Sequence, residues 1–322
     1  MRYYLAPMEG ITGQIFRRVY DSCFPTMDKY FAPFVSPNKN GKLSPREQRE
    51  LEPDNNQGLY VVPQILTNSS TDFIRTARVL QSMGYQEVNL NLGCPSGTVV
   101  SKKRGAGFLA YPDQVDQCLH EIFSALDMRI SVKTRLGMEK PEEFEHLLEI
   151  YNQYPINELI IHPRVRTDYY RNKPHMESFR LAVRTSPNPL CYNGDIFCGE
   201  DLRRIKEEFP GLEAVMLGRG IIANPGLLCQ DVRGVMAKEL LREFHDRLYE
   251  EYCREFLASS GQKVVLFKMK EIWCYLLYAF ENGEKAGKKI KKAQRTEDYE
   301  AAVSFIFHEC PLISGGGFRG TP

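Results

Sequence analysis

The segment NLNLGCPSGTVVSKKRGAGFL, residues 89–109, contains the pattern that decides the fold. It begins with a short apolar run that delivers a polar side chain, Asn91, and such a run predicts a buried strand. Gly93 then lets the chain turn closely, and Cys94 precedes a proline, which prevents a helix from starting at once. A buried strand with a polar residue at its C-terminal end recurs along the chain.

Eight apolar runs predict eight strands, and segments that predict helices, such as residues 70–83 and 112–126, lie between most of them. The runs are residues 3–6, 30–35, 59–65, 88–92, 130–133, 159–162, 190–192 and 214–217. Eight β/α alternations over roughly 220 residues match a (β/α)8 TIM barrel, whose strands are buried on both faces. A doubly wound open sheet is the main alternative.

Polar residues at the ends of the runs favour the barrel. They are Glu9, Gln64, Asn91, Lys133, His162, Asn193 with Asp195, and Arg219. In a closed barrel these ends converge on one mouth, whereas in an open sheet they would be spread along an edge. We therefore expect an α/β fold of the TIM-barrel type.

The character of the sequence changes after Pro225, where long helical stretches at residues 232–259 and 263–282 precede a lysine-rich piece and a last helix at 297–309. We expect a barrel domain over residues 1–230 and a helical domain over 231–312. The glycine-rich end, residues 313–322, has no apolar periodicity and predicts a flexible tail.

Composition excludes several classes of protein. With 43% hydrophobic and 26% charged residues, the 322-residue chain can bury a core, which excludes a disordered or fibrous protein. The sequence has no long apolar window, and its start, MRYYLAPMEG, does not resemble a signal peptide. We therefore expect neither export nor a membrane span. Nine cysteines without a Cys-x-x-Cys pair indicate a reducing cytoplasm and no metal site.

Cys94 and Lys133 are the first candidates for chemistry. A lone cysteine is often a small buried hydrophobe, but its place at a barrel mouth favours catalysis, and a mostly protonated thiol can act as a general acid. A lysine at a strand end in the mouth is costly unless something pairs with it. Lys133 either faces an anion or an electron-rich ring, or forms a salt bridge with Glu9 or Asp195.

Three further motifs lie after the later strands. The tripeptides Asn193-Gly194-Asp195 and Gly218-Arg219-Gly220 suit a phosphate, although each alone is also an ordinary turn. His162 is followed by Arg164 and Arg166; the histidine is either structural or a ligand contact, and the arginines are either a solvated face or part of the site.

In this order the motifs resemble those of the tRNA-dihydrouridine synthases, a family of FMN-dependent reductases. The similarity covers Ala6-Pro7-Met8, Gln64, residues 91–95, residues 104–107, Val132-Lys133, His162, residues 193–195 and residues 218–220, with a weaker match at 268–270 and 273–276. It implies a barrel that holds FMN and a helical domain that binds tRNA. The residues it places around FMN are Pro7, Met8, Glu9, Gln64, Lys133, His162, Asn193, Gly194, Asp195, Gly218 and Arg219.

The resemblance also implies a reaction, the reduction of specific tRNA uridines to 5,6-dihydrouridine with NADPH or NADH as electron donor. Reduced FMN would deliver a hydride to C6, and Cys94 would deliver a proton to C5. Asn91, Arg164 and Arg166 would bind the substrate, and the protein is expected to be a monomer. One departure concerns Arg164, because the family commonly has His-Gly-Arg where this chain has His162-Pro163-Arg164.

Charge is unevenly distributed in a chain whose net charge is only +1. Residues 38–50, 101–104, 164–173 and 262–295 together carry 20 basic and 6 acidic residues, which leaves 22 basic and 35 acidic residues elsewhere. Such segregation is typical of a face that neutralises phosphates, although lysine runs are often only solvated helix faces.

Two other functions are compatible with parts of this pattern. One is a flavoenzyme that acts on a small free pyrimidine, as dihydroorotate dehydrogenases do; the basic appendage argues against it, because a free pyrimidine needs no such surface. The other is a nonenzymatic RNA-binding protein, which the intact Cys94 and Lys133 argue against.

Overall fold

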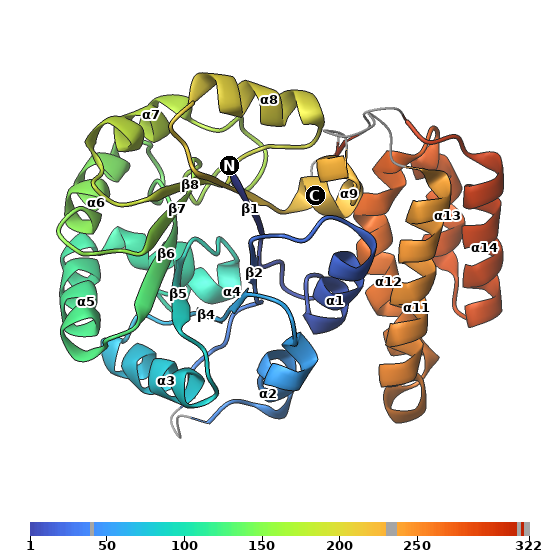
Figure 1. Cartoon of the computed structure of the whole chain (residues 1–322), viewed down its shortest axis with the longest axis horizontal. Helices are drawn as coiled ribbons and strands as arrows, with labels where there is room; N and C mark the ends of the chain where they lie inside the picture. The colour runs from blue at the N-terminus through green and yellow to red at the C-terminus, as the bar shows by residue number, and fades with distance from the viewer. Residues whose placement is uncertain (39–41, 230–236, 314–316, 319–322) are drawn as a thin grey trace.

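The computed structural model describes residues 1–38, 42–229, 237–313 and 317–318, and its N-terminal part is a ring of parallel strands surrounded by helices (Figure 1). The strand order is β3-β2-β1-β9-β8-β7-β6-β5-β4, and every strand pair is parallel. The strands are β1 Arg2–Leu5, β2 Lys29–Phe31, β3 Val61–Val62, β4 Gln64–Ile65, β5 Glu87–Leu92, β6 Arg129–Arg135, β7 Glu158–His162, β8 Leu190–Tyr192 and β9 Ala214–Leu217.

Pro63 divides the third predicted run into two strands. Proline has no backbone N–H to donate to a ladder, but its carbonyl accepts a hydrogen bond from the Asn89 N–H at 2.9 Å. β3 pairs with β2 and β4 pairs with β5, so this one run closes the ring. The predicted TIM barrel is therefore confirmed. An open sheet is excluded because the two ends of the strand order, β3 and β4, are consecutive in the chain and are joined directly through Pro63.

Amphipathic helices surround the strands. In α5 the buried residues Val115, Cys118, Leu119 and Ile122 recur at the spacing that places them on one helix face, against the sheet. The helices of this part are α1 Gln14–Cys23, α2 Pro45–Leu51, α3 Ser70–Ser82, α4 Gly97–Val100, α5 Pro112–Ala125, α6 Glu143–Tyr151, α7 Met176–Thr185, α8 Gly199–Glu208 and α9 Arg219–Ala223, with short 3-10 turns at Pro53–Asn56, Gly105–Ala110 and Leu227–Cys229. None of the helices in the described part of the chain combines the length and apolar character needed to span a membrane.

A group of helices lies beside α1 and α9 on one flank of the barrel (Figure 1). Phe244 of α11 sits edge-on to Phe16, Tyr20 and Phe24, with ring centroids 5.2–6.4 Å apart, so the helical part shares one apolar core with the barrel. The helices are α11 Lys238–Ser260, α12 Gln262–Leu276, the short turn Leu277–Ala279, α13 Gly283–Lys292 and α14 Thr296–Glu309.

The expected boundaries can be compared with these helices only in part. The expected division between residues 230 and 231 lies outside the described residues. Most of the expected tail is also outside them, but Ile313 donates a backbone hydrogen bond to Ala279 at 2.9 Å. Phe318, 5% exposed, packs against Phe197 and Tyr278. These two points tie the end of the described chain to both the helical part and the barrel.

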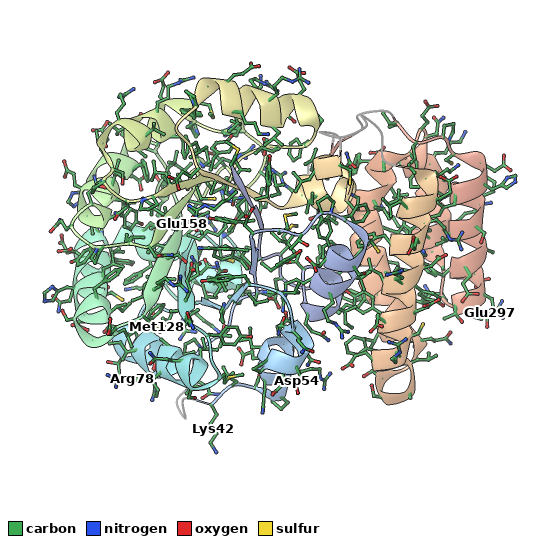
Figure 2. All side chains as sticks on the ribbon, viewed as in Figure 1. Lys42, Asp54, Arg78, Met128, Glu158 and Glu297 are labelled. Atoms are coloured by element: carbon green, nitrogen blue, oxygen red, sulfur yellow. The ribbon has the colours of Figure 1, made fainter. Side chains whose placement is uncertain are left out.

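The N-terminal ends of the strands carry three buried charged residues and two tyrosines, here together called the floor cluster: Lys29, Glu87 and Glu158, with Tyr4 and the partly exposed Tyr60. The Lys29 Nζ lies 2.9 and 3.1 Å from the two Glu87 oxygens and 3.0 Å from a Glu158 oxygen. The Tyr4 and Tyr60 hydroxyls donate to Glu158 and Glu87. Figure 2 labels Glu158 among the strands, in contrast to Lys42 and Glu297 on the periphery. Each charge of the floor cluster is therefore paired within the protein.

Candidate active site

The C-terminal ends of the strands, here called the mouth, bring together polar residues from distant parts of the sequence. Parallel register places Asn91 opposite Lys133 and Arg135 opposite His162 on neighbouring strands. The mouth residues are Gln64 on β4, Asn91 on β5, Lys133 and Arg135 on β6, His162 on β7, Asn193 and Asp195 after β8, and Gly218 and Arg219 after β9. Convergence at this end is what a closed parallel barrel imposes.

A chain of buried amides crosses three strands at the mouth. The Asn91 Nδ2 donates to the Gln64 Oε1 at 2.6 Å, and the Gln64 Nε2 donates to the Asn89 Oδ1 at 2.7 Å. Asn89 then donates to Ser131 at 2.9 Å. The Gln64 amide is thus held in one orientation, and it retains one unused N–H and one unused lone pair.

The loop that carries Cys94 is held from both sides. The Asn91 Oδ1 accepts hydrogen bonds from the backbone N–H groups of Gly93 and Cys94, each at 3.0 Å. On the other side the Cys94 carbonyl accepts from the Ala106 N–H at 3.0 Å. Gly105 has φ +55°, and a Cβ there would lie 2.8 Å from the Cys94 carbonyl oxygen, so the loop needs glycine at this position.

The environment of the Cys94 thiol keeps it protonated. Burial raises the pKa of this thiol, and a hydrogen bond from the Ser96 backbone N–H, with the nearby Lys133 and Arg135, only partly offsets the effect. A raised thiol pKa disfavours the thiolate and leaves a proton available for transfer. The arrangement suits an acid better than a nucleophile.

Lys133 is a half-buried cation without a counterion among the described residues. Burial, with a smaller contribution from Arg135, lowers the pKa of its ammonium group to about 8. No hydrogen bond or ion pair joins the Lys133 side chain to another residue of the described chain. The alternative of a salt bridge is wrong, because Glu9 pairs with Arg46 at 2.5 Å and Asp195 is held by Arg164 and Arg219. Lys133 is free to face an anion or an electron-rich ring.

The Asp195 carboxylate is held by two arginines. Arg164 donates from both terminal nitrogens to its two oxygens at 2.9 and 2.5 Å, and Arg219 donates to one of them at 2.7 Å. The Arg164 Nη1 also lies 3.0 Å from the His162 Nε2. Burial and the surrounding positive charges keep the His162 pKa well below its usual range, so the imidazole is neutral. Because the Nε2 must then accept, the Nδ1 carries the proton, a tautomer assigned from this contact.

The Arg164 side chain is buried below the surface of the mouth, where a substrate would not reach it directly. Its side chain is 1% exposed, and its Nε donates to the Asn172 carbonyl at 2.7 Å in addition to the contacts with Asp195 and His162. The carbonyl of the preceding residue, Pro163, accepts a hydrogen bond from the His175 N–H at 2.7 Å. Arg164 therefore positions His162 and Asp195 in this structure.

Aromatic rings from the loop after β7, the loop after β8 and the end of the described chain surround the Arg219 guanidinium. The Tyr170 ring lies 4.4 Å from the guanidinium carbon, and the rings of Phe197 and Phe318 lie 5.1 and 5.3 Å from it. A Cβ at Gly218 would meet Ala6 and Met8 at 3.3 and 3.4 Å, so the backbone approaches β1 closely there. Gly194 has a different explanation, because a Cβ would overlap the Tyr192 hydroxyl at 2.0 Å.

The remaining expected residues are placed as follows. Pro7 and Met8 are half-buried in the turn after β1, with Met8 beside Gly218. The Asn193 Nδ2 donates to the Met216 carbonyl at 2.9 Å and so links β8 to β9. Glu9 lies at the edge of the mouth: its side chain is 44% exposed and pairs with Arg46, and its charge contributes to the raised pKa of the Cys94 thiol. The turn after β1 carries it towards the helical part, where it lies beside Glu271.

Two residues of the mouth are missing from the sequence-based prediction. Arg135 donates from Nε to the Gly93 carbonyl at 3.0 Å and from Nη1 to the carbonyls of Val165 and Tyr169 at 3.0 and 2.9 Å. It lies two positions after Lys133 on the same strand, so the period of two could have identified it. Tyr170 has no comparable signal, because it lies in an irregular loop.

The fold and the mouth define a TIM-barrel enzyme whose site combines a protonated thiol with uncompensated positive charge. The family model described as Dihydrouridine synthase (Dus) matches residues 4–306. The chain belongs to this family and is therefore an oxidoreductase.

Relatives with assigned names agree with the family match. A probable tRNA-dihydrouridine synthase of Staphylococcus aureus is 30% identical over 278 residues, which cover 83% of each chain. The tRNA-dihydrouridine synthase B of Pasteurella multocida is 27% identical over 227 residues, covering 70% of this chain and 67% of that one. A probable tRNA-dihydrouridine synthase 2 of Bacillus subtilis is 27% identical over 264 residues, 79% of each chain.

Solved structures share the fold at low identity. The old yellow enzyme homologue of Zymomonas mobilis has a TM-score of 0.50 at 11% identity, covering 76% of this chain and 92% of that chain. A 2-naphthoyl-CoA reductase complex has a TM-score of 0.55 at 10% identity, covering 72% and 50%. At these identities the likeness concerns the barrel architecture alone.

Proposed function

We propose that the protein reduces specific uridines of tRNA to 5,6-dihydrouridine, with FMN as cofactor and NADPH or NADH as the source of electrons. The observation that carries this proposal is the pair formed by Lys133 and Cys94. A half-buried ammonium without a counterion among the described residues and a thiol whose pKa is raised come from neighbouring strands at one mouth.

The residues of the mouth fit a flavin. The unpaired Lys133 would balance negative charge on the pyrimidine part of the ring, and Gln64 and the His162 Nδ1 offer unused hydrogen-bonding groups. Arg219, with the backbone at Gly194 and Gly218, would hold the phosphate, and Asn193 and Asp195 would position these loops. When bound and reduced, the flavin supplies the hydride for C6 of the uracil.

Cys94 would supply the proton for C5. A hydride at C6 leaves negative charge on C5 and the C4 carbonyl, and a proton from the thiol removes that charge. Asn91 fixes the thiol loop through two backbone hydrogen bonds, so it would place the acid as well as lie near the uracil. Arg166, whose guanidinium makes no ion pair within the described residues, remains available for the RNA, whereas Arg164 would act through His162 and Asp195.

The substrate RNA would lie over the mouth and the helical part. Arg171, Lys173 and most of the lysines of α13 are exposed, which favours phosphate contacts. The target base must leave its stack to reach Cys94, and this unstacking costs a few kcal/mol. We also propose that the protein acts as a cytoplasmic monomer and needs no metal.

The test is dihydrouridine formation on unmodified tRNA transcripts with FMN and NADPH. The Cys94→Ala variant is expected to bind FMN and to lose activity by about 10²–10⁴-fold, the usual contribution of a positioned acid. Cys274→Ala, at an exposed cysteine of α12, is the matched control. Undiminished turnover by Cys94→Ala would remove the assigned acid. Turnover of free dihydroorotate but not of tRNA would favour the small-pyrimidine alternative.

A further inference from the structure

The loop after β7 presents an exposed tyrosine in an unusual backbone conformation. Tyr169 has φ +49°, a left-handed conformation that costs free energy for a residue with a bulky side chain. Its side chain is 37% exposed, and no other aromatic ring of the described residues contacts it. A strained, exposed aromatic residue beside a catalytic mouth requires an explanation.

The left-handed conformation accompanies a hydrogen bond that organises the site. The Tyr169 carbonyl points into the barrel, where it accepts from the Arg135 Nη1 at 2.9 Å. The same guanidinium holds the Gly93 carbonyl, next to Cys94, at 3.0 Å. Because the carbonyl points inward, the Tyr169 side chain lies outward on the rim, and its position is tied to that of the Cys94 loop.

The Tyr169 ring is half of a stacking pair. The Arg166 guanidinium carbon lies 5.2 Å from the ring centroid, and no hydrogen bond or ion pair to another described residue uses this guanidinium. Asp168, the acidic residue of the loop, is buried and accepts from Val165, Asn172 and His175. The outer surface of the loop is therefore cationic with one open aromatic ring, the combination that binds single-stranded bases.

We propose that Tyr169, supported by Arg166, stacks against the nucleobase adjacent to the uridine that enters the mouth. A uridine that leaves its stack exposes one face of its neighbour, and an aromatic ring on the rim can cover that face. Arg166 keeps the ring in place and can contact the neighbouring phosphate. Tyr169 is thus a positioning residue for the RNA, and the inference rests on the proposed function.

The first test measures binding of an unmodified, fluorescently labelled tRNA transcript by anisotropy. Tyr169→Ala and Tyr169→Gly are both expected to weaken binding about tenfold or more, and Tyr169→Phe is expected to restore it. Recovery by Tyr169→Gly would overturn the inference, because glycine relieves the backbone strain without supplying a ring. A loss in Tyr169→Phe equal to that in Tyr169→Ala would also overturn it.

Tyr60 provides a matched control. It is 40% exposed, lies at the opposite end of the barrel, and has the Arg129 guanidinium 5.8 Å from its ring. Tyr60→Ala is expected to lower stability without changing tRNA affinity. An equal loss of affinity in both alanine variants would show a general effect on folding and overturn the inference. A weaker affinity of Tyr169→Ala for FMN, measured by flavin fluorescence, would also overturn it.

The second test identifies the stacked base on a transcript whose reduced uridine has been mapped. An abasic residue on one side of that uridine is expected to abolish the difference between wild type and Tyr169→Ala; persistence of the difference with either flank abasic would overturn the inference. Wild-type protein that binds tRNA with this Tyr169 dependence but forms no dihydrouridine would refute the proposed function alone. Normal reduction and binding by Tyr169→Ala would refute the inference alone.

Discussion

The two ends of the barrel both bury charged side chains, but only one end neutralises them. At the floor, Lys29 lies within 3.1 Å of two carboxylates, Glu87 and Glu158. At the mouth, no carboxylate of the described residues pairs with Lys133, and Asp195 is shared by Arg164 and Arg219. The same residue type, a strand lysine, is therefore paired at one end and unpaired at the other.

The difference separates a stabilising cluster from a binding site. Buried charges that are fully paired cannot be removed singly without leaving an uncompensated partner. A buried charge without a partner lowers stability by itself and is retained where it serves a ligand. Lys29 and Lys133 should therefore respond differently to the same substitution.

The largest effect is expected at the floor. Lys29→Met leaves Glu87 buried without a cation and Glu158 with only the partly exposed Arg2, 3.3 Å away, and should lower the free energy of unfolding by about 3–5 kcal/mol. Lys133→Met is the matched substitution at the mouth and should leave stability equal or higher at neutral pH. Urea denaturation of both variants without added cofactor measures the difference, and equal losses would contradict the comparison.

Ligand binding should show the opposite order. Lys133→Met is expected to weaken FMN binding by about 10–100-fold, because a charge-assisted contact contributes about 1.5–3 kcal/mol. Lys29→Met, measured under conditions where it remains folded, should bind FMN like the wild type. Quenching of flavin fluorescence gives both dissociation constants. Unchanged affinity in Lys133→Met would mean that its ammonium does not face the cofactor.

The pH dependence of stability should also identify Lys133. Its pKa is lowered to about 8 in the folded protein from 10.5, so between these values the unfolded chain binds more protons. Stability of the wild type relative to Lys133→Met should therefore rise with pH above about 8, by up to about 1.4 kcal/mol per unit. Parallel pH profiles of the two proteins would argue against an unpaired buried ammonium.

The smallest effects are expected at the surface. Replacing Lys288, Lys289, Lys291 and Lys292 together by glutamine should reduce the slope of log affinity for tRNA against log salt by up to about one per residue that contacts phosphate. Arg184→Gln, at the floor end of α7, is the control and should leave the slope unchanged. A slope unaffected by the four α13 substitutions would place the RNA elsewhere.

The barrel and most mouth residues could be predicted because they follow from local pattern. Apolar runs buried on both faces predict parallel strands, and ring closure brings their polar ends together regardless of side-chain detail. Pro63 is consistent with this, since it interrupts a strand without interrupting the ring. The sequence of Gly283–Lys292 predicts only a lysine-rich piece. The way this helix packs could not be predicted, because it depends on the close contact of Gly287 with Leu277.

Pairing between distant side chains could not be predicted. Glu9 and Asp195 were equal candidates as partners of Lys133, and the choice depended on Arg46 and Arg164, from other loops. Asn91 was expected near the substrate, and its two backbone contacts to the Cys94 loop depend on a turn geometry that composition does not specify. Tertiary placement, not residue type, decides such roles.

Asn91 gives the mouth a mechanical property of its own. The Asn91 carboxamide donates to Gln64 through its nitrogen and accepts from the backbone of the Cys94 loop through its oxygen. If a cofactor ring binds against Gln64 as proposed, a shift of that amide would pass through the Asn91 carboxamide to residue 94. Occupancy of the barrel and the resting position of the sulfur would then be linked through one planar side chain.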